Sequence, residues 1–215
     1  MMTLIVNEIF YSIQGESLNS GRPCVFVRLT GCNLRCIYCD TEYAYEEGDE
    51  MTIEKIIDQV STYHCTLVEL TGGEPLIQEE TPKLIDALLK KNYEVMMETN
   101  GTLDIDRVSN TCMKVLDIKC PSSGESLNND YHNIEKLTKR DQLKFVIGSR
   151  EDYMFAKDMV LSRCKTIEPG HILFSPVYDL LKPDILAGWI LKDHLNVRFH
   201  LQLHRIIWPD ISRGV

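Results

Sequence analysis

The sequence predicts an α/β fold with a parallel sheet that is either open or curved into a partial barrel. Short runs rich in β-branched and apolar residues alternate with amphipathic helical patterns, and no long polar linker interrupts the alternation. The chain has 215 residues, of which 44% are hydrophobic, so it is long enough to bury one full core. We therefore expect a single domain over residues 1–215.

Several runs have the length and the residue types of β-strands. Their apolar content is that of strands buried within a sheet, and turn residues follow most of them. The expected strands are Cys24–Leu29, Leu67–Thr71, Glu94–Thr99, Lys114–Ile118, Gln142–Ile147, His171–Phe174 and Val197–Leu203.

Amphipathic helices are expected between several of these strands. One follows the cap candidate Thr52, and another follows Thr81-Pro82, because Pro is favoured in the first helical turn. A further helix is expected from about Pro183 to Leu195. The apolar stripes of the first two helices are Ile53, Ile56, Ile57 and Val60, and Leu84, Ile85, Leu88 and Leu89.

Charge and composition exclude several classes of protein. A net charge of -9 and a pI near 5.2 leave no diffuse basic surface, so nucleic acid is not an expected partner. The segment Met1–Phe10 carries Glu8 and has no basic leader, so we expect neither a secretory signal nor a transit peptide. No run has the length of a membrane span, and no membrane association is expected. We therefore expect a cytoplasmic protein.

The eight cysteines are expected to be free thiols or metal ligands rather than a disulfide framework. Most of them are scattered and form no second C-x-x-C pair, so we expect these to be small buried apolar residues. The scattered cysteines are Cys24, Cys65, Cys112, Cys120 and Cys164.

Polar motifs follow the predicted strands at their carboxyl ends. Loops gather at this edge of a parallel sheet, and active sites form there. We expect the motifs to form the lip of one site. They are Thr71-Gly72-Gly73-Glu74-Pro75, Glu98-Thr99-Asn100-Gly101, the segment from Asp117 to Ser122, and Phe174-Ser175-Pro176.

Cys32, Cys36 and Cys39 lie in one loop directly after a predicted strand, in the pattern C-x3-C-x2-C. A structural zinc site usually has four protein ligands, and an electron-carrying cluster usually has four cysteines. Three thiolates on a 4Fe-4S cubane would leave one iron open to chelate a substrate. The sequence favours this open-iron cluster, and structural zinc and a plain redox cluster are the alternatives.

This cysteine pattern, with Tyr38 before the last cysteine, and the Gly72-Gly73-Glu74-Pro75 turn resemble the radical S-adenosylmethionine superfamily. The resemblance implies an α/β fold of the partial, open β/α barrel type. It also implies a 4Fe-4S cluster whose open iron binds the amine and carboxylate of S-adenosylmethionine. Cleavage would yield a 5'-deoxyadenosyl radical, which the protein orients against one hydrogen of a substrate.

Further motifs, spread over nearly the whole chain, are similar to those of 7-carboxy-7-deazaguanine synthases. That resemblance implies conversion of 6-carboxy-5,6,7,8-tetrahydropterin into 7-carboxy-7-deazaguanine with loss of ammonia, in the biosynthesis of queuosine and other 7-deazapurines. Magnesium, a homodimer and an external one-electron reductant of the flavodoxin or ferredoxin type are implied as well. The motifs are Ile9-Phe10-Tyr11-Ser12-Ile13-Gln14-Gly15-Glu16-Ser17, Gly21-Arg22-Pro23, Phe26-Val27-Arg28, Cys39-Asp40-Thr41 and Leu201-Gln202-Leu203-His204.

Carried onto this chain, the resemblance implies a set of site residues. The cluster would be held by Cys32, Cys36 and Cys39, and magnesium would be bound by the Thr41 hydroxyl. The substrate would contact Ile13, Gln14, Gly15, Glu16, Arg28, Thr71, His204 and the C-terminal Val215. S-adenosylmethionine would contact Tyr38, Cys39, Asp40, Gly73, Glu74, Cys120, Pro121, Ser122, Ser175 and Pro176.

Physical chemistry supports some of these roles directly. Arg28 lies on an otherwise apolar strand, where a guanidinium is costly to bury unless an anion meets it. A pterin has an edge of donors and acceptors that Gln14 and Glu16 could read. Magnesium takes few protein ligands, and the Thr41 hydroxyl with substrate oxygens would suffice.

Ordinary structural roles remain open for the same residues. Arg28 could pair with a structural carboxylate, and Thr41 could be a helix cap. Gln14-Gly15-Glu16 and Gly72-Gly73 could be tight turns, and His204 could be a core histidine.

Two other functions compete with the synthase. An activating enzyme for a glycyl-radical protein, such as anaerobic ribonucleotide reductase, has the same cysteine spacing and a partial barrel, but its substrate is a protein. That function leaves Arg28 without a small anionic ligand. A non-catalytic metal-binding module is the second competitor.

Overall fold

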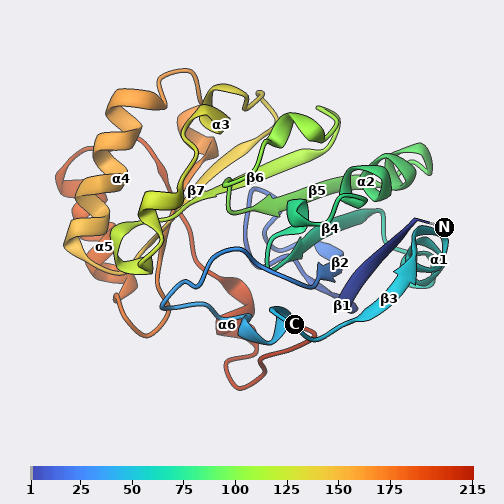
Figure 1. Cartoon of the computed structure of the whole chain (residues 1–215). Coiled ribbons are helices and arrows are strands. Elements are labelled where there is room, and N and C mark those ends of the chain that lie inside the picture. Colours follow the sequence, from blue (N-terminus) through green and yellow to red (C-terminus); the bar gives the residue numbers. More distant parts are fainter. Residues whose placement is uncertain (1) are drawn as a thin grey trace.

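The computed structural model describes residues 2–215, and Met1, where the predicted domain begins, lies outside them. These residues form a nine-stranded sheet in the order β3-β1-β2-β4-β5-β6-β7-β8-β9 (Figure 1). The strands are β1 (Thr3–Ile13), β2 (Pro23–Leu29), β3 (Asp49–Thr52), β4 (Leu67–Gly72), β5 (Glu94–Thr99), β6 (Met113–Ile118), β7 (Gln142–Ile147), β8 (Ile172–Pro176) and β9 (Arg198–Phe199). The α-helices are α1 (Ile53–Ser61), α2 (Thr81–Lys90), α3 (His132–Glu135), α4 (Arg150–Arg163), α5 (Pro183–Lys192) and α6 (Leu203–Ile207).

The predicted open α/β sheet is confirmed, and every neighbouring pair from β2 to β9 is parallel. The first strand departs from a parallel sheet, because β1 is antiparallel to both β2 and β3. The loop over residues 14–22 between β1 and β2 is too short for the crossover that parallel neighbours need. β1 and β3 are absent from the predicted strands, so the sheet is larger at this edge than expected.

The helices that were predicted from apolar stripes are present. The Thr52 side chain caps α1 by accepting a hydrogen bond from the backbone nitrogen of Lys55, and Pro82 lies in the first turn of α2. The third predicted helix ends at Lys192, three residues earlier than expected, because the chain then turns through His194 with a φ of 49°. α4 was not predicted, since its apolar residues do not gather on one face.

The last predicted strand, Val197–Leu203, is wrong in length. Only Arg198–Phe199 pairs with β8, and the His200 nitrogen adds one more hydrogen bond, to Phe174. Leu203 instead begins α6, and its nitrogen donates to the Gly15 carbonyl in the β1–β2 loop. The chain therefore leaves the sheet early and crosses to the first strands.

Apolar residues pack on both faces of the sheet. The larger core lies between the sheet and the helices, whereas the inner face carries only a small apolar cluster. In Figure 1, α1, α2, α4 and α5 lie on the outer side, and α6 lies on the other side near the C-terminus. The inner cluster consists of Phe10, Cys24, Phe26, Leu67, Met96 and Val115, and the strands continue from it toward polar residues at their carboxyl ends.

All eight cysteines are free, and of the five scattered ones all but the half-buried Cys65 are buried, as expected. No helix within residues 2–215 combines the length and the apolar character that a membrane span requires.

Candidate active site

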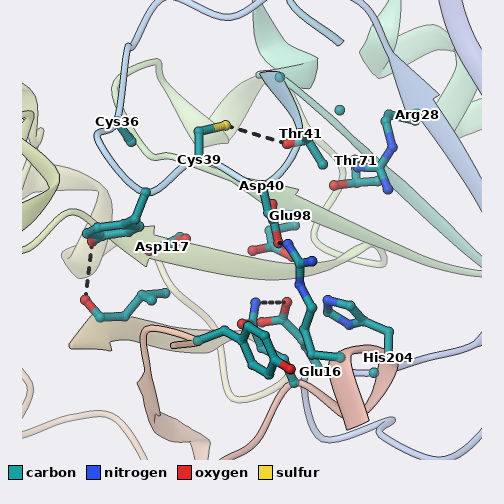
Figure 2. Close-up of a pocket in the computed structure, with 18 of the residues that line it drawn as sticks. Glu16, Arg28, Cys36, Cys39, Asp40, Thr41, Thr71, Glu98, Asp117 and His204 are labelled. Atoms are coloured by element: carbon teal, nitrogen blue, oxygen red, sulfur yellow. Dashed lines mark hydrogen bonds and ion pairs between the residues drawn. The ribbon is translucent and has the colours of Figure 1, made fainter. Parts of the chain in front are cut away.

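A cavity of about 580 Å³ opens at the carboxyl ends of the strands. Its wall brings together residues from the loop that carries Cys32, Cys36 and Cys39, from the strand ends and from the chain after β9. We call this loop the cluster loop. Figure 2 shows Cys36, Cys39 and Thr41 on one side of this cavity and Glu16 and His204 on the opposite side, with Glu98 between them. Three of the four motifs predicted to form one site contribute residues to this cavity, and the motif Phe174-Ser175-Pro176 does not.

The three clustered cysteines all line this cavity, and the five scattered cysteines do not. The loop that carries them is held by hydrogen bonds from the Ile37 nitrogen to the Ser123 carbonyl, 3.0 Å, and from the Arg35 nitrogen to a Glu125 carboxylate oxygen, 2.7 Å. No three His, Cys, Asp or Glu residues in the described chain lie close enough together to hold a single metal ion. The described residues place the three thiols of this loop on one wall of the cavity.

The Gly72-Gly73 turn supports the cluster loop through backbone hydrogen bonds. The Gly73 nitrogen donates to Leu29, and the Glu74 nitrogen donates to Gly31 at 2.8 Å. A β-carbon on Gly73 would lie 2.1 Å from the Gly31 carbonyl oxygen and 2.7 Å from the Cys32 β-carbon. The glycine is therefore required by a close backbone approach, and the motif positions the first cysteine.

The Glu74 side chain points into the protein. Its carboxylate is fully buried and accepts hydrogen bonds from the backbone nitrogens of Leu76 and Asn100 and from the Thr99 hydroxyl. These bonds tie the turn after β4 to the end of β5. The carboxylate thus fixes the loops that surround the cavity.

Lys119 and Asp117 lie next to the cysteines at the end of β6, and their ion pair is 2.9 Å long. Burial raises the pKa of the Cys36 thiol to about 11, while the Lys119 cation acts in the opposite direction. Burial also opposes the charge on Lys119, but Asp117 and Cys36 outweigh it and raise the lysine pKa. Lys119 is therefore a fixed positive charge beside the thiols.

Arg28 projects from β2 into the cavity, opposite Thr71 on β4. Its Nε donates to Glu8 Oε1 at 2.8 Å, and its side chain is only 12% exposed. Within residues 2–215 its two terminal nitrogens have no hydrogen-bond partner. The guanidinium thus has a structural partner on one side and two terminal NH2 groups left for an anion.

Glu16 belongs to an ionic cluster in the cavity wall. Lys144 Nζ lies 2.6 Å from Glu16 Oε2, 2.5 Å from Glu98 Oε1 and 3.8 Å from Asp117 Oδ2. Burial raises the pKa of Glu16, but Lys144 and His204 outweigh it and hold that pKa well below its usual range. The three carboxylates therefore share one buried ammonium.

The chain after β9, residues 200–215, closes the other side of the cavity, and we call it the C-terminal segment. His204 and Val215 both line it, and the space beside Gly15 is filled by the His204 ring. Arg205 pairs with Asp40 at 3.2 Å and so connects α6 to the cluster loop. Thr41 lies beside Cys39, with 3.7 Å between its hydroxyl oxygen and the cysteine sulfur.

Comparison with known proteins shows the family to which this chain belongs. Residues 26–144 match the radical SAM superfamily. The 7-carboxy-7-deazaguanine synthase of Chlorobaculum tepidum is 44% identical over 220 residues, which cover 99% of this chain and 97% of that protein. That of Koribacter versatilis is 39% identical over 224 residues, covering 98% and 99%. The chain belongs to the 7-carboxy-7-deazaguanine synthase family.

The fold of this 7-carboxy-7-deazaguanine synthase family member agrees with a solved structure. QueE from Escherichia coli superposes with a TM-score of 0.77 over 94% of this chain and 95% of that chain, at 23% identity. Membership of the radical SAM superfamily implies a 4Fe-4S cluster and S-adenosylmethionine.

Most of the residues that the resemblance assigned to the site line the cavity of this synthase family member. The remainder lie behind its wall: Cys120, Ser175 and Pro176 are buried, and Ser122 donates its hydroxyl hydrogen bond to Asp152. The assigned residues in the wall are Ile13, Gln14, Gly15, Glu16, Arg28, Cys32, Cys36, Tyr38, Cys39, Asp40, Thr41, Thr71, Gly73, His204 and Val215, and those outside it are Glu74, Cys120, Pro121, Ser122, Ser175 and Pro176.

Several residues of the cavity wall were not predicted from the sequence. Lys144 and Glu69 are charged residues within otherwise apolar strands, which is the same signal that identified Arg28. Gln202 lies in the motif Leu201-Gln202-Leu203-His204, but it was given no role in the site. Arg205 lies in the short helix α6 and Tyr178 lies in a turn, and no local pattern identifies either residue.

Proposed function

We propose that this protein converts 6-carboxy-5,6,7,8-tetrahydropterin into 7-carboxy-7-deazaguanine with loss of ammonia, as a radical SAM carbon–nitrogen lyase in 7-deazapurine (queuosine) biosynthesis. The observation that carries the proposal is the cavity that Arg28 shares with the three clustered cysteines. Relatives named 7-carboxy-7-deazaguanine synthase that match almost the full chain support the same reaction.

Cys32, Cys36 and Cys39 would hold the 4Fe-4S cluster as thiolates, with Lys119 offsetting part of the negative charge. When bound, the cluster and S-adenosylmethionine supply a radical that takes a hydrogen atom from the substrate. Tyr38, whose hydroxyl donates to the Val146 carbonyl at 3.3 Å, would hold the loop against the far wall. This contact would connect the cluster loop to β7.

The substrate would lie between the cluster loop and the C-terminal segment. The terminal nitrogens of Arg28 would form a fork with the substrate carboxylate, next to the Thr71 hydroxyl on the neighbouring strand. Ile13 and Gly15 would contact the ring from the end of β1, with His204 and Val215 facing them. Closure by this segment excludes water from the reacting atoms.

Magnesium would bind at Thr41, whose hydroxyl lies on the cavity wall. A hard cation with one protein ligand takes its other ligands from water and substrate oxygens. Asp40 is held by Arg205, so it is an unsuitable direct ligand while that 3.2 Å ion pair is intact.

The protein would act as a homodimer in the cytoplasm, with a flavodoxin or ferredoxin as the electron donor. The cluster loop offers such a donor an approach, because Ile37 is 77% exposed next to Cys36. The activating-enzyme function is not favoured, since relatives named as synthases cover nearly the entire chain.

Anaerobic turnover tests the proposal directly. Reconstituted protein, S-adenosylmethionine, magnesium, a reductant and carboxytetrahydropterin should yield the deazaguanine product, detected by mass, together with 5'-deoxyadenosine. Cleavage of S-adenosylmethionine without the deazaguanine product would contradict the proposed substrate while leaving the radical chemistry intact.

A further inference from the structure

Glu69 is a buried carboxyl in the cavity wall with no role in the site described so far. It lies in β4, it is 3% exposed, and it lines the cavity. The neighbouring carboxylates Glu16, Glu98 and Asp117 all pair with lysine side chains. Within residues 2–215, Glu69 forms no ion pair with any cation. A buried acid of this kind requires hydrogen-bond donors from another source.

Among residues 2–215, Gln14 is the single side chain that forms a hydrogen bond with the Glu69 carboxyl. Gln14 Nε2 donates to Glu69 Oε2, while Gln14 Oε1 accepts from the Glu16 backbone nitrogen at 2.8 Å. Both ends of the Gln14 amide are therefore used within the protein. Oε1 of Glu69 has no hydrogen-bond partner in the described chain, and each carboxylate oxygen can accept more than one bond.

The separation between Glu69 and Arg28 along the sheet suits a bicyclic ligand that contacts one residue at each end. Arg28 is opposite Thr71 in the register of β2 and β4, whereas Glu69 is opposite Phe26. Strands rise about 3.3 Å per residue, so Glu69 lies roughly 7 Å deeper along the strand than Thr71. Phe26 also lines the cavity and supplies an apolar surface at this deeper level.

Pterins carry two adjacent N–H donors, the 2-amino group and the N3–H, at the end of the ring remote from the 6-carboxylate. We propose that Glu69 is the specificity-determining residue that accepts hydrogen bonds from this amino-pyrimidinone edge. Gln14 then holds the carboxylate in place rather than reading the substrate itself. The inference rests on the proposed function, because it assigns one end of the proposed substrate to a named residue.

The assignment is tested by asking whether Glu69→Gln reverses the preference of the protein between a ligand with a 2-amino group and one with a 2-oxo group. The deazaguanine product keeps the 2-amino group beside an N–H, whereas its 2-oxo analogue, 7-carboxy-7-deazaxanthine, presents an acceptor beside an N–H. A carboxylate complements the first edge, and an amide complements the second. Both ligands should be titrated into anaerobic holoenzyme, with wild type, Glu69→Gln and the exposed control Glu94→Gln compared at equal cluster content.

Wild type and Glu94→Gln should bind the 2-amino ligand at least about tenfold more tightly than the 2-oxo ligand, because a mismatched edge leaves buried polar groups unpaired. Glu69→Gln should reverse this preference. A merely structural role for Glu69 would weaken both ligands equally and would overturn the inference.

Equal binding of the two ligands by wild type would overturn the inference even if Glu69→Gln failed to fold. Turnover of carboxytetrahydropterin by wild type distinguishes failure of the role assigned to Glu69 from failure of the proposed synthase function. Turnover without edge preference refutes the role of Glu69 alone. Absence of both turnover and binding refutes the proposed function and the inference with it.

Discussion

Glu8 and Arg28 face each other across the antiparallel β1–β2 pair, and a 2.8 Å ion pair joins Glu8 Oε1 to Arg28 Nε. A structural carboxylate and a substrate anion were the two partners that the sequence left open for Arg28. The fork of the guanidinium accommodates both, because Nε holds the side chain against β1 while the terminal nitrogens remain for a ligand.

Arg28→Ala should lower kcat/KM for carboxytetrahydropterin by at least roughly tenfold, since loss of one partner of a desolvated charge pair costs on the order of 2 to 5 kcal/mol. Arg28→Lys should recover little, because an ammonium cannot form the fork. Steady-state kinetics at matched iron content is the measurement. The control is uncoupled S-adenosylmethionine cleavage, which should persist. An unchanged kcat/KM would show that Arg28 serves only Glu8.

Gly73→Ala should reduce the iron bound per chain severalfold. Its β-carbon would lie 2.1 Å from the Gly31 carbonyl oxygen, so the cluster loop must shift away from the turn. Iron analysis and visible absorbance after anaerobic reconstitution measure the effect. Gly188→Ala in α5 is the matched control, because a β-carbon there would lie more than 4 Å from every atom of residues 2–215 outside its chain neighbours and the adjacent backbone of its own helix. Equal iron content in both variants would argue against the supporting role of the turn.

Lys144→Met should lower the free energy of unfolding by about 3 kcal/mol, because Glu16, Glu98 and Asp117 would lose the ammonium that they share. Denaturant unfolding under anaerobic conditions measures this difference. Lys83→Met is the control, since the Lys83 side chain is 56% exposed and its surface ion pair with Glu80 is worth at most about 1 kcal/mol. If the two variants unfold at the same denaturant concentration, the ionic cluster is not a major source of stability.

Binding of the deazaguanine product should strengthen as pH rises toward about 8. Burial, followed by the Glu98 charge, raises the pKa of Glu69 to about 8, with Glu16 adding to the shift and Gln14 and Lys144 opposing it. Below that pH the ligand-free carboxyl is protonated, and accepting two N–H donors in ionised form releases its proton. Linkage then gives up to about a tenfold gain in affinity per pH unit, levelling off above about 8.

Titration calorimetry in two buffers of different ionisation enthalpy counts the released protons. Glu69→Gln should remove the pH dependence, because the amide does not titrate. A wild-type affinity that is constant from about pH 6 to about pH 9 would contradict this prediction.

The sequence was most informative where a residue type is costly without a partner. Arg28 was identified in this way, since a guanidinium on an apolar strand is costly to bury without an anion, whereas the Gly72-Gly73 turn was identified from its place after a predicted strand and from the family resemblance. Lys144 and Glu69 carry the same signal in β7 and β4, and they could have been identified by the same argument.

Other parts of the site could not be derived from local patterns. Arg205 and Gln202 reach the cavity because the chain leaves the sheet after β9 and docks on the β1–β2 loop, through the hydrogen bond from the Leu203 nitrogen to Gly15. This docking is a tertiary contact without periodicity. Glu74 belongs to a motif that looked like a cofactor contact, yet its carboxylate is used by the backbone nitrogens of Leu76 and Asn100.

A radical generated at the cysteine cluster is proposed to act on the pterin in the shared cavity. Carboxytetrahydropterin with deuterium at C6 should be turned over anaerobically, and the 5'-deoxyadenosine and the recovered S-adenosylmethionine should be analysed by mass. We expect the label to move from the substrate into the adenosyl group, because the two reacting carbons must approach closely. Product formation with no deuterium in either adenosyl compound would contradict it.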